Sequence, residues 1–184
     1  SVTYGNGFQN GYRGKDLSGT GVGLKFDFII VHESGHEWFG NNVSMIDSAD
    51  MWIHEGFTNY SENLFVEYHF SKKEAQDYVI GTRRNIKNDQ PIIAAYGVNK
   101  SGSSDMYYKG GNLLHTIRQV INDDEKWRSI LRGIQRDFGL ITVTTKQIEN
   151  YISQKAGIDL SKVFDQYLRT TKIPELNYII LGKE

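Results

Sequence analysis

The stretch His32-Glu33-Ser34-Gly35-His36 places two imidazoles four residues apart, with a carboxylate beside the first. The apolar run over residues 26–31 before it and the aromatic pair Trp38-Phe39 after it predict a helix from about Leu24 to Phe39, which Gly40 would end. In a helix, residues i and i+4 lie on one face, so both rings can reach one cation while Glu33 holds a water close by. The stretch therefore predicts a metal site in a helical fold, and it is the main reason to expect an enzyme.

A catalytic site of this kind needs a third ligand. The metzincin pattern would require Gly at position 39 and His at position 42, but the chain has Phe39 and Asn42. Eighteen residues separate His36 from Glu55, which lies in a second segment with helical periodicity from about Trp52 to His69. Two His and one Glu form a catalytic zinc set that leaves the fourth position to water.

These residues resemble the zinc aminopeptidases of the gluzincin group, the M1 type that includes aminopeptidase N and leukotriene A4 hydrolase. Residues 36–41 look like the family's His-x-Trp-Phe-Gly-Asn, and residues 52–57 look like its Trp-Leu-Asn-Glu-Gly-Phe. Residues 107–114 are similar to its Tyr-x-Lys-Gly-x-x-x-Leu. Thermolysin has one residue more between the second His and the Glu, so the spacing favours the aminopeptidase branch. The resemblance implies a mainly α fold, the helical half of a thermolysin-like (gluzincin) catalytic domain, with short strand segments at its termini.

The same resemblance implies the chemistry. One Zn²⁺ per chain would be held by His32, His36 and Glu55, with Glu33 as general base acting on peptides that have a free N-terminus. Tyr107 would donate a hydrogen bond to the oxyanion, with Tyr108 as its variable neighbour.

Outer-shell groups are expected on the second helix, because a ligand His usually donates its other ring nitrogen to an acceptor. The polar residues Glu55, Asn59 and Glu62 recur at helical spacing in an otherwise apolar segment. We favour Asn59 as that acceptor. Glu62 fits a buried structural hydrogen bond and an outer-shell role equally well. His54, beside Glu55, is a weaker candidate for substrate contact.

Three alternatives stay open at this point. An endopeptidase or an epoxide hydrolase could use the same metal site, and a non-catalytic module could use zinc only to tie two helices together. A structural zinc site normally has four protein ligands, whereas the sequence offers three and an adjacent carboxylate.

Composition excludes several other classes of function. The chain has 184 residues, 21 basic and 22 acidic, so charge gives no reason to expect nucleic acid or a membrane surface as a partner. It has no cysteine, which rules out disulfides, and the compartment is left open. The glycine-rich residues 5–23 match no nucleotide-binding pattern and are expected to be a connecting loop.

A single domain is expected over residues 1–184, as a fragment of a larger catalytic domain. It would comprise a strand end and loop (1–23), the zinc-binding helix pair (24–69), a helical remainder (70–173) and the start of a following strand (174–184). Ser71-Lys72-Lys73-Glu74 is a capping box that should open a helix fading near Asn88. The family's amine-recognition motif contains a Met-Glu pair, and residues 1–23 have none. We therefore expect the N-terminal part, and a C-terminal part, of the same polypeptide as partners, and little or no activity from the isolated chain.

Overall fold

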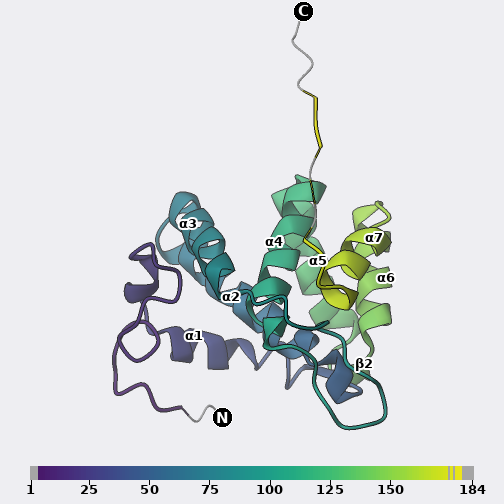
Figure 1. The fold of residues 1–184 in the computed structure, drawn as a ribbon, viewed down its shortest axis with the longest axis horizontal. Coiled ribbons are helices and arrows are strands. Elements are labelled where there is room, and N and C mark those ends of the chain that lie inside the picture. The colour runs from purple at the N-terminus through teal and green to yellow at the C-terminus, as the bar shows by residue number, and fades with distance from the viewer. Residues whose placement is uncertain (1–3, 174, 176, 180–184) are drawn as a thin grey trace, which may run out of the picture.

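The computed structural model describes residues 4–173, 175 and 177–179, and this part of the chain is mainly helical (Figure 1). Its α-helices are α1 (Phe28–Gly35), α2 (Trp52–His69), α3 (Lys72–Thr82), α4 (Tyr108–Ile121), α5 (Asp124–Asp137), α6 (Thr145–Ala156) and α7 (Ser161–Phe164). Short 3₁₀ turns cover Val22–Leu24, Ser48–Asp50, Arg83–Asn85 and Ser104–Met106, and a π-helical turn covers Asp165–Arg169. The predicted fold class is confirmed.

Helix α2 forms the centre of the molecule and packs against α1, α3 and α4 (Figure 1). It buries Trp52, Ile53, Phe57 and Tyr60 almost completely, against α4 side chains such as Leu113. A helix that contacts neighbours on several sides is apolar around much of its circumference, and polar side chains inside it need partners there. The bounds predicted for this helix, Trp52 to His69, are confirmed.

Helix α1 is shorter than the predicted span of 24–39. It begins at Phe28 because the Asp27 side chain accepts the N–H of Ile30 at 3.2 Å, a strong N-cap that separates it from the 3₁₀ turn before it. After Gly35 the chain tightens, and the N–H of His36 bonds to the carbonyl of Glu33, three residues back, at 3.2 Å. His36 keeps right-handed helical dihedrals, so its side chain continues the face that carries His32.

Two short parallel strands, β1 (Val43–Met45) and β2 (Ile141–Val143), pair with Val43 opposite Ile141. The sequence analysis identified neither strand, because three-residue strands leave too short a pattern to recognise. Residues 177–179 of the expected terminal strand are irregular, and the rest of both expected terminal strands, at residues 2, 3, 180 and 181, lies outside the described residues.

The predicted cap at Ser71 is confirmed, but the helix that it opens is shorter than predicted. The Ser71 side chain accepts the N–H of Glu74 at 3.1 Å and opens α3, which ends at Thr82 and continues only as the 3₁₀ turn to Asn85. Thr144 and Gln147 form a complete capping box at the start of α6. Within the described part of the chain, no helix is long and apolar enough to cross a membrane.

Candidate metal centre

The residues predicted as metal ligands converge from two helices. His32 lies in α1, His36 directly follows it, and Glu55 lies in the first turn of α2. The Oε2 atom of Glu55 is 3.3 Å from Nε2 of His32 and 3.4 Å from Nε2 of His36. One ligand atom from each of the three residues lies within 4.8 Å of the others, which is close enough for all three to bind one cation.

Glycines allow these helices to approach closely. A Cβ atom on Gly35 would lie 3.0 Å from Cγ2 of Thr58 on α2, so a side chain there would push α1 and α2 apart. A Cβ on Gly56 would lie 3.3 Å from the Cα of Gly110 on α4. The two helix contacts bring α1 and the start of α4 to the same end of α2.

The second ring nitrogen of His32 contacts Glu62, whose side chain is fully buried. Nδ1 of His32 lies 2.8 Å from Oε1 of Glu62, and the hydroxyl of Tyr78 donates to Oε2 at 2.7 Å. The amide of Asn59 donates to both carboxylate oxygens, at 3.2 and 3.3 Å. Glu62 is therefore the partner of His32, although the sequence favoured Asn59 for this contact. Asn59 instead donates to the carboxylate of Glu62.

The second ring nitrogen of His36 has partners that the sequence analysis missed. Nδ1 lies 3.0 Å from the carbonyl oxygen of Phe39 and 3.2 Å from Oγ1 of Thr58. The carbonyl contact exists because the chain turns tightly after Gly35. A proton on Nδ1 shared with that carbonyl leaves the lone pair of Nε2 directed at Glu55 and the shared point between the ligands. Thr58 could have been found only by its position one helical turn after Glu55.

The ionisation of these groups shows a site built to hold positive charge. Burial alone would lower the pKa of His32, but hydrogen bonds to Glu55 and Glu62 outweigh it and raise that pKa to about 10. Burial would raise the pKa of Glu55, but hydrogen bonds to the two histidines lower it to about 2. A metal ion that bound to these three residues would have to displace the protons of the two imidazoles. The donor set of two imidazoles and one carboxylate, with an acceptor behind each ring, fits zinc.

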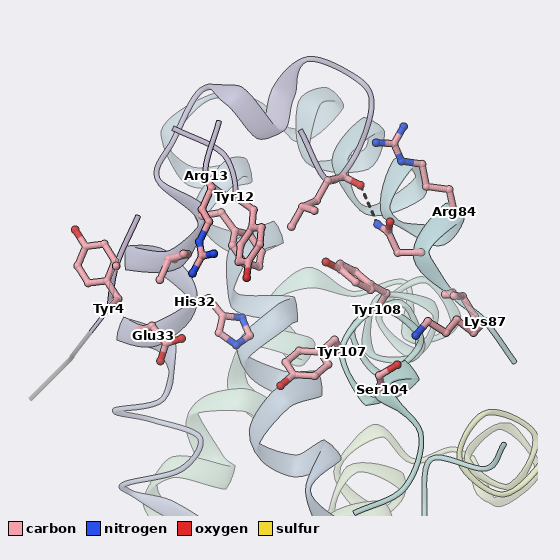
Figure 2. A pocket seen from close by; sticks show the side chains of 16 residues that line it. Tyr4, Tyr12, Arg13, His32, Glu33, Arg84, Lys87, Ser104, Tyr107 and Tyr108 are labelled. Carbon is pink, nitrogen blue, oxygen red and sulfur yellow. Dashed lines mark hydrogen bonds between the residues drawn. The ribbon is translucent and has the colours of Figure 1, made fainter. Parts of the chain in front are cut away.

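The two residues predicted to be catalytic line a cleft of about 770 Å³ beside the metal centre (Figure 2). Glu33 projects into the cleft next to His32 and lies outside the cluster of ligand atoms. The ring of Tyr107 lies 5.8 Å from that of His32. Burial, and then the negative charge of Glu55, raise the pKa of Tyr107 to about 12, so the phenol keeps its proton at neutral pH. Tyr108 lines the same cleft.

His54 has a structural contact. Its Nε2 accepts the backbone N–H of Met45 at 2.8 Å, which ties α2 to β1, and it does not line the cleft. The expectation that His54 contacts substrate stays a prediction, because this backbone contact does not test it. His115 is buried in α4, away from the cleft, as expected of a packed histidine.

Comparison with known proteins identifies the family. The Peptidase family M1 domain matches residues 24–167. Endoplasmic reticulum aminopeptidase 1 of Mus musculus is 27% identical over 132 residues, which cover 66% of this chain and 14% of that protein. Leucyl aminopeptidase of Saccharolobus solfataricus is 23% identical over 166 residues, 84% of this chain and 21% of that protein.

A solved structure shares the fold. The crystal structure of the M1 zinc metallopeptidase from Deinococcus radiodurans superposes with a TM-score of 0.70 at 22% identity, covering 86% of this chain and 36% of that one. The chain thus spans about a fifth or less of the length of the two curated relatives and about a third of the solved structure. Because the family's domain pattern extends over most of the sequence and takes in both helices of the metal centre, the chain belongs to peptidase family M1.

Proposed function

We propose that this chain carries the catalytic centre of a zinc aminopeptidase, which removes the N-terminal residue from peptides. The observation that carries the proposal is the convergence of His32, His36 and Glu55 beside a cleft that is lined by His32, Glu33 and Tyr107. The names of the relatives support it, since the two curated relatives are aminopeptidases. A mutant of the Deinococcus enzyme was crystallised with the substrate Tyr-Ser-Ala.

His32, His36 and Glu55 would hold one Zn²⁺ per chain. The bound ion would lower the pKa of a water molecule and polarise the scissile carbonyl. Glu62 would keep His32 in the tautomer whose Nε2 is free to bind, with Asn59 and Tyr78 orienting the carboxylate of Glu62. The Phe39 carbonyl and Thr58 would do the same for His36.

Glu33 is the group available to move protons. It lies in the cleft next to His32 and is not one of the clustered ligand atoms, so its carboxylate can accept a proton from the attacking water and deliver it to the leaving amine. Tyr107 is placed to donate a hydrogen bond to the substrate oxygen as negative charge develops there. A tyrosine hydroxyl keeps its proton at neutral pH and can therefore donate this hydrogen bond.

Hydrolysis of aminoacyl fluorogenic amides tests the proposal. The 184-residue chain and any longer natural polypeptide that contains it are assayed with and without a chelator, and again after zinc is added back. Cleavage of amides with a free α-amine, lost with the chelator and restored by zinc, is the expected result. Cleavage of N-terminally blocked peptides would instead indicate an endopeptidase, and turnover of an epoxide alone an epoxide hydrolase. Because little activity is expected from the 184-residue chain alone, zinc binding without any turnover would indicate a non-catalytic module only if the longer polypeptide is inactive as well.

A further inference from the structure

The cleft beside the metal centre is lined by more positive than negative side chains. Arg13, Arg84 and Lys87 line it together with a single carboxylate, that of Glu33, among the described residues. In Figure 2, His32 and Glu33 lie on one side of Tyr107, and Lys87 and Ser104 lie on the other. A peptide whose scissile bond lies between Glu33 and Tyr107 could therefore extend toward Lys87.

Two of the three cations are already engaged. The guanidinium of Arg84 donates to the backbone carbonyl of Asp16 at 2.7 Å, which fixes it against the glycine-rich loop. The guanidinium of Arg13 lies over the ring of Tyr12, 5.6 Å from its centroid. Among the described residues, the ammonium of Lys87 has no hydrogen-bond or ion-pair partner. Lys87 is thus the positive charge in the cleft that remains available to a ligand.

Nearby acidic side chains form no ion pair with Lys87, although hydrogen bonds and, to a smaller extent, the charge of Lys87 lower the pKa of Asp89. Asp89, two residues along the chain, accepts hydrogen bonds from the Ser103 hydroxyl at 2.5 Å and from the Gln90 N–H at 2.9 Å. Asp105 accepts two backbone N–H groups, and its carboxylate is buried, with 1% of the residue exposed. Neither carboxylate lies within ion-pair distance of the Lys87 ammonium.

The backbone of Lys87 is held against the turn that leads into Tyr107. The N–H groups of Lys87 and Asn88 donate to the two oxygens of Asp105, at 2.8 and 2.6 Å. Asp105 follows Ser104 in the 3₁₀ turn Ser104–Met106, and Tyr107 comes directly after that turn. One buried carboxylate therefore fixes Lys87, Ser104 and Tyr107 relative to one another. The Ser104 hydroxyl is exposed and, like Lys87, has no partner among the residues that the structure describes.

We propose that Lys87, assisted by the hydroxyl of Ser104, binds a carboxylate of the peptide substrate away from the scissile bond. The enzyme therefore prefers peptides that carry a negative charge there, supplied either by the C-terminal carboxylate of a short peptide or by an acidic side chain. This inference rests on the proposed peptidase function. An ammonium and a hydroxyl together offer the donors that a carboxylate accepts, and the deficit of negative charge in the cleft favours an anion further.

Two matched pairs of peptides separate the sources of the carboxylate. Leu-Ala-Ala is compared with its C-terminal amide, and amidated Leu-Glu-Ala is compared with amidated Leu-Gln-Ala. We expect kcat/KM to be about fivefold higher for the charged member of at least one pair, mainly through KM, as for one solvent-exposed ion pair. The preference should weaken as ionic strength rises.

Variants at position 87 test the residue itself. Lys87→Ala should remove the preference, Lys87→Glu should reverse it and Lys87→Arg should retain it, while hydrolysis of the uncharged peptides stays unchanged. Ser104→Ala should reduce it in part. Lys162→Ala, an equal change of charge at an exposed lysine of α7 outside the cleft, is the matched control and should behave as wild type.

The possible results distinguish a failure of this inference from a failure of the proposed function. If wild type hydrolyses both members of each pair equally well, Lys87 does not select substrates, although the peptidase proposal stands. The same holds if the preference survives in Lys87→Ala. If the longer polypeptide hydrolyses no peptide, the peptidase proposal fails. Calorimetry then measures the binding of the two peptide pairs to the zinc-loaded protein, and this binding decides whether Lys87 recognises the carboxylate. Equal affinity of wild type and Lys87→Ala for the charged peptides would overturn the inference.

Discussion

Glu62→Gln isolates the contact behind His32, one of the three proposed metal ligands. The substitution keeps the size of a side chain that is fully buried and removes its charge. In wild type, Oε1 of Glu62 lies 2.8 Å from Nδ1 of His32, and the same carboxylate accepts hydrogen bonds from Tyr78 and Asn59. We expect the variant to fold and to bind one zinc at saturation, but with weaker affinity.

The magnitude follows from the kind of bond that is changed. A hydrogen bond to a charged acceptor is roughly twice as strong as one between neutral groups, and this one lies out of solvent. Loss of such an outer-shell partner typically costs about 10- to 100-fold in metal affinity, or about 1.4–2.8 kcal/mol. We expect the zinc dissociation constant to rise by that factor.

Competition with a zinc chelator of known affinity measures the change. Tyr78→Phe is the control, because it removes one hydrogen bond from the far oxygen of Glu62 and leaves the charge in place. It should cost about 1 kcal/mol of stability and change zinc affinity by less than the Gln variant does. A zinc affinity in Glu62→Gln within about twofold of wild type, with the fold intact by circular dichroism, would refute the role given to Glu62.

Three further predictions concern catalysis and stability. Glu33→Gln should keep its zinc, measured by elemental analysis, and lose activity by at least about 10²–10⁴-fold, whereas loss of zinc would make Glu33 a ligand. Tyr107→Phe should lower kcat by about 10²–10³-fold with little change in KM, and a larger loss in Tyr108→Phe would assign the oxyanion role to Tyr108 instead. Hydrogen bonds from Arg118 lower the pKa values of Glu67 and Asp124 from ordinary values of 4.5 and 3.8. The stability they contribute is therefore present above those values and lost as pH falls below them, so Arg118→Met should flatten the fall in Tm from about pH 5 to pH 3. An unchanged pH profile would show that this ion-pair network adds nothing to stability.

Local patterns in the sequence were sufficient to predict the long helices and to predict that the three proposed ligands lie close together. The apolar pattern of residues 52–69 predicted the bounds of α2, since the helix buries apolar side chains along most of its length. Helix α1 was predicted too long because apolar residues continue on both sides of it. The side chain of Asp27 decides where the helix starts, and the tight turn after Gly35 decides where it ends.

The partners of the two histidines could not be predicted in the same way, because they depend on contacts between elements. Asn59 and Glu62 differ by less than one helical turn, and both are polar, so the sequence pattern could not tell which of them faces His32. The answer depends on the rotation of α1 against α2. The carbonyl of Phe39, being backbone, leaves no trace in the side-chain pattern at all. The parallel pairing of β1 with β2 joins residues almost a hundred positions apart, so it too depends on a contact between elements and could not be predicted from local sequence.

Small residues explain how separate motifs become one site. Gly56 follows the ligand Glu55, and Gly110 lies three residues after Tyr107. A Cβ on Gly110 would lie 3.1 Å from the Cα of Gly56, so α2 and α4 touch backbone to backbone beside the cleft. Side chains at either position would separate the helices, and with them the metal ligand and the phenol that are expected to act on the same substrate atom. Gly56 and Gly110 are thus required by helix packing, and this packing brings two motifs that lie about fifty residues apart together at the candidate site.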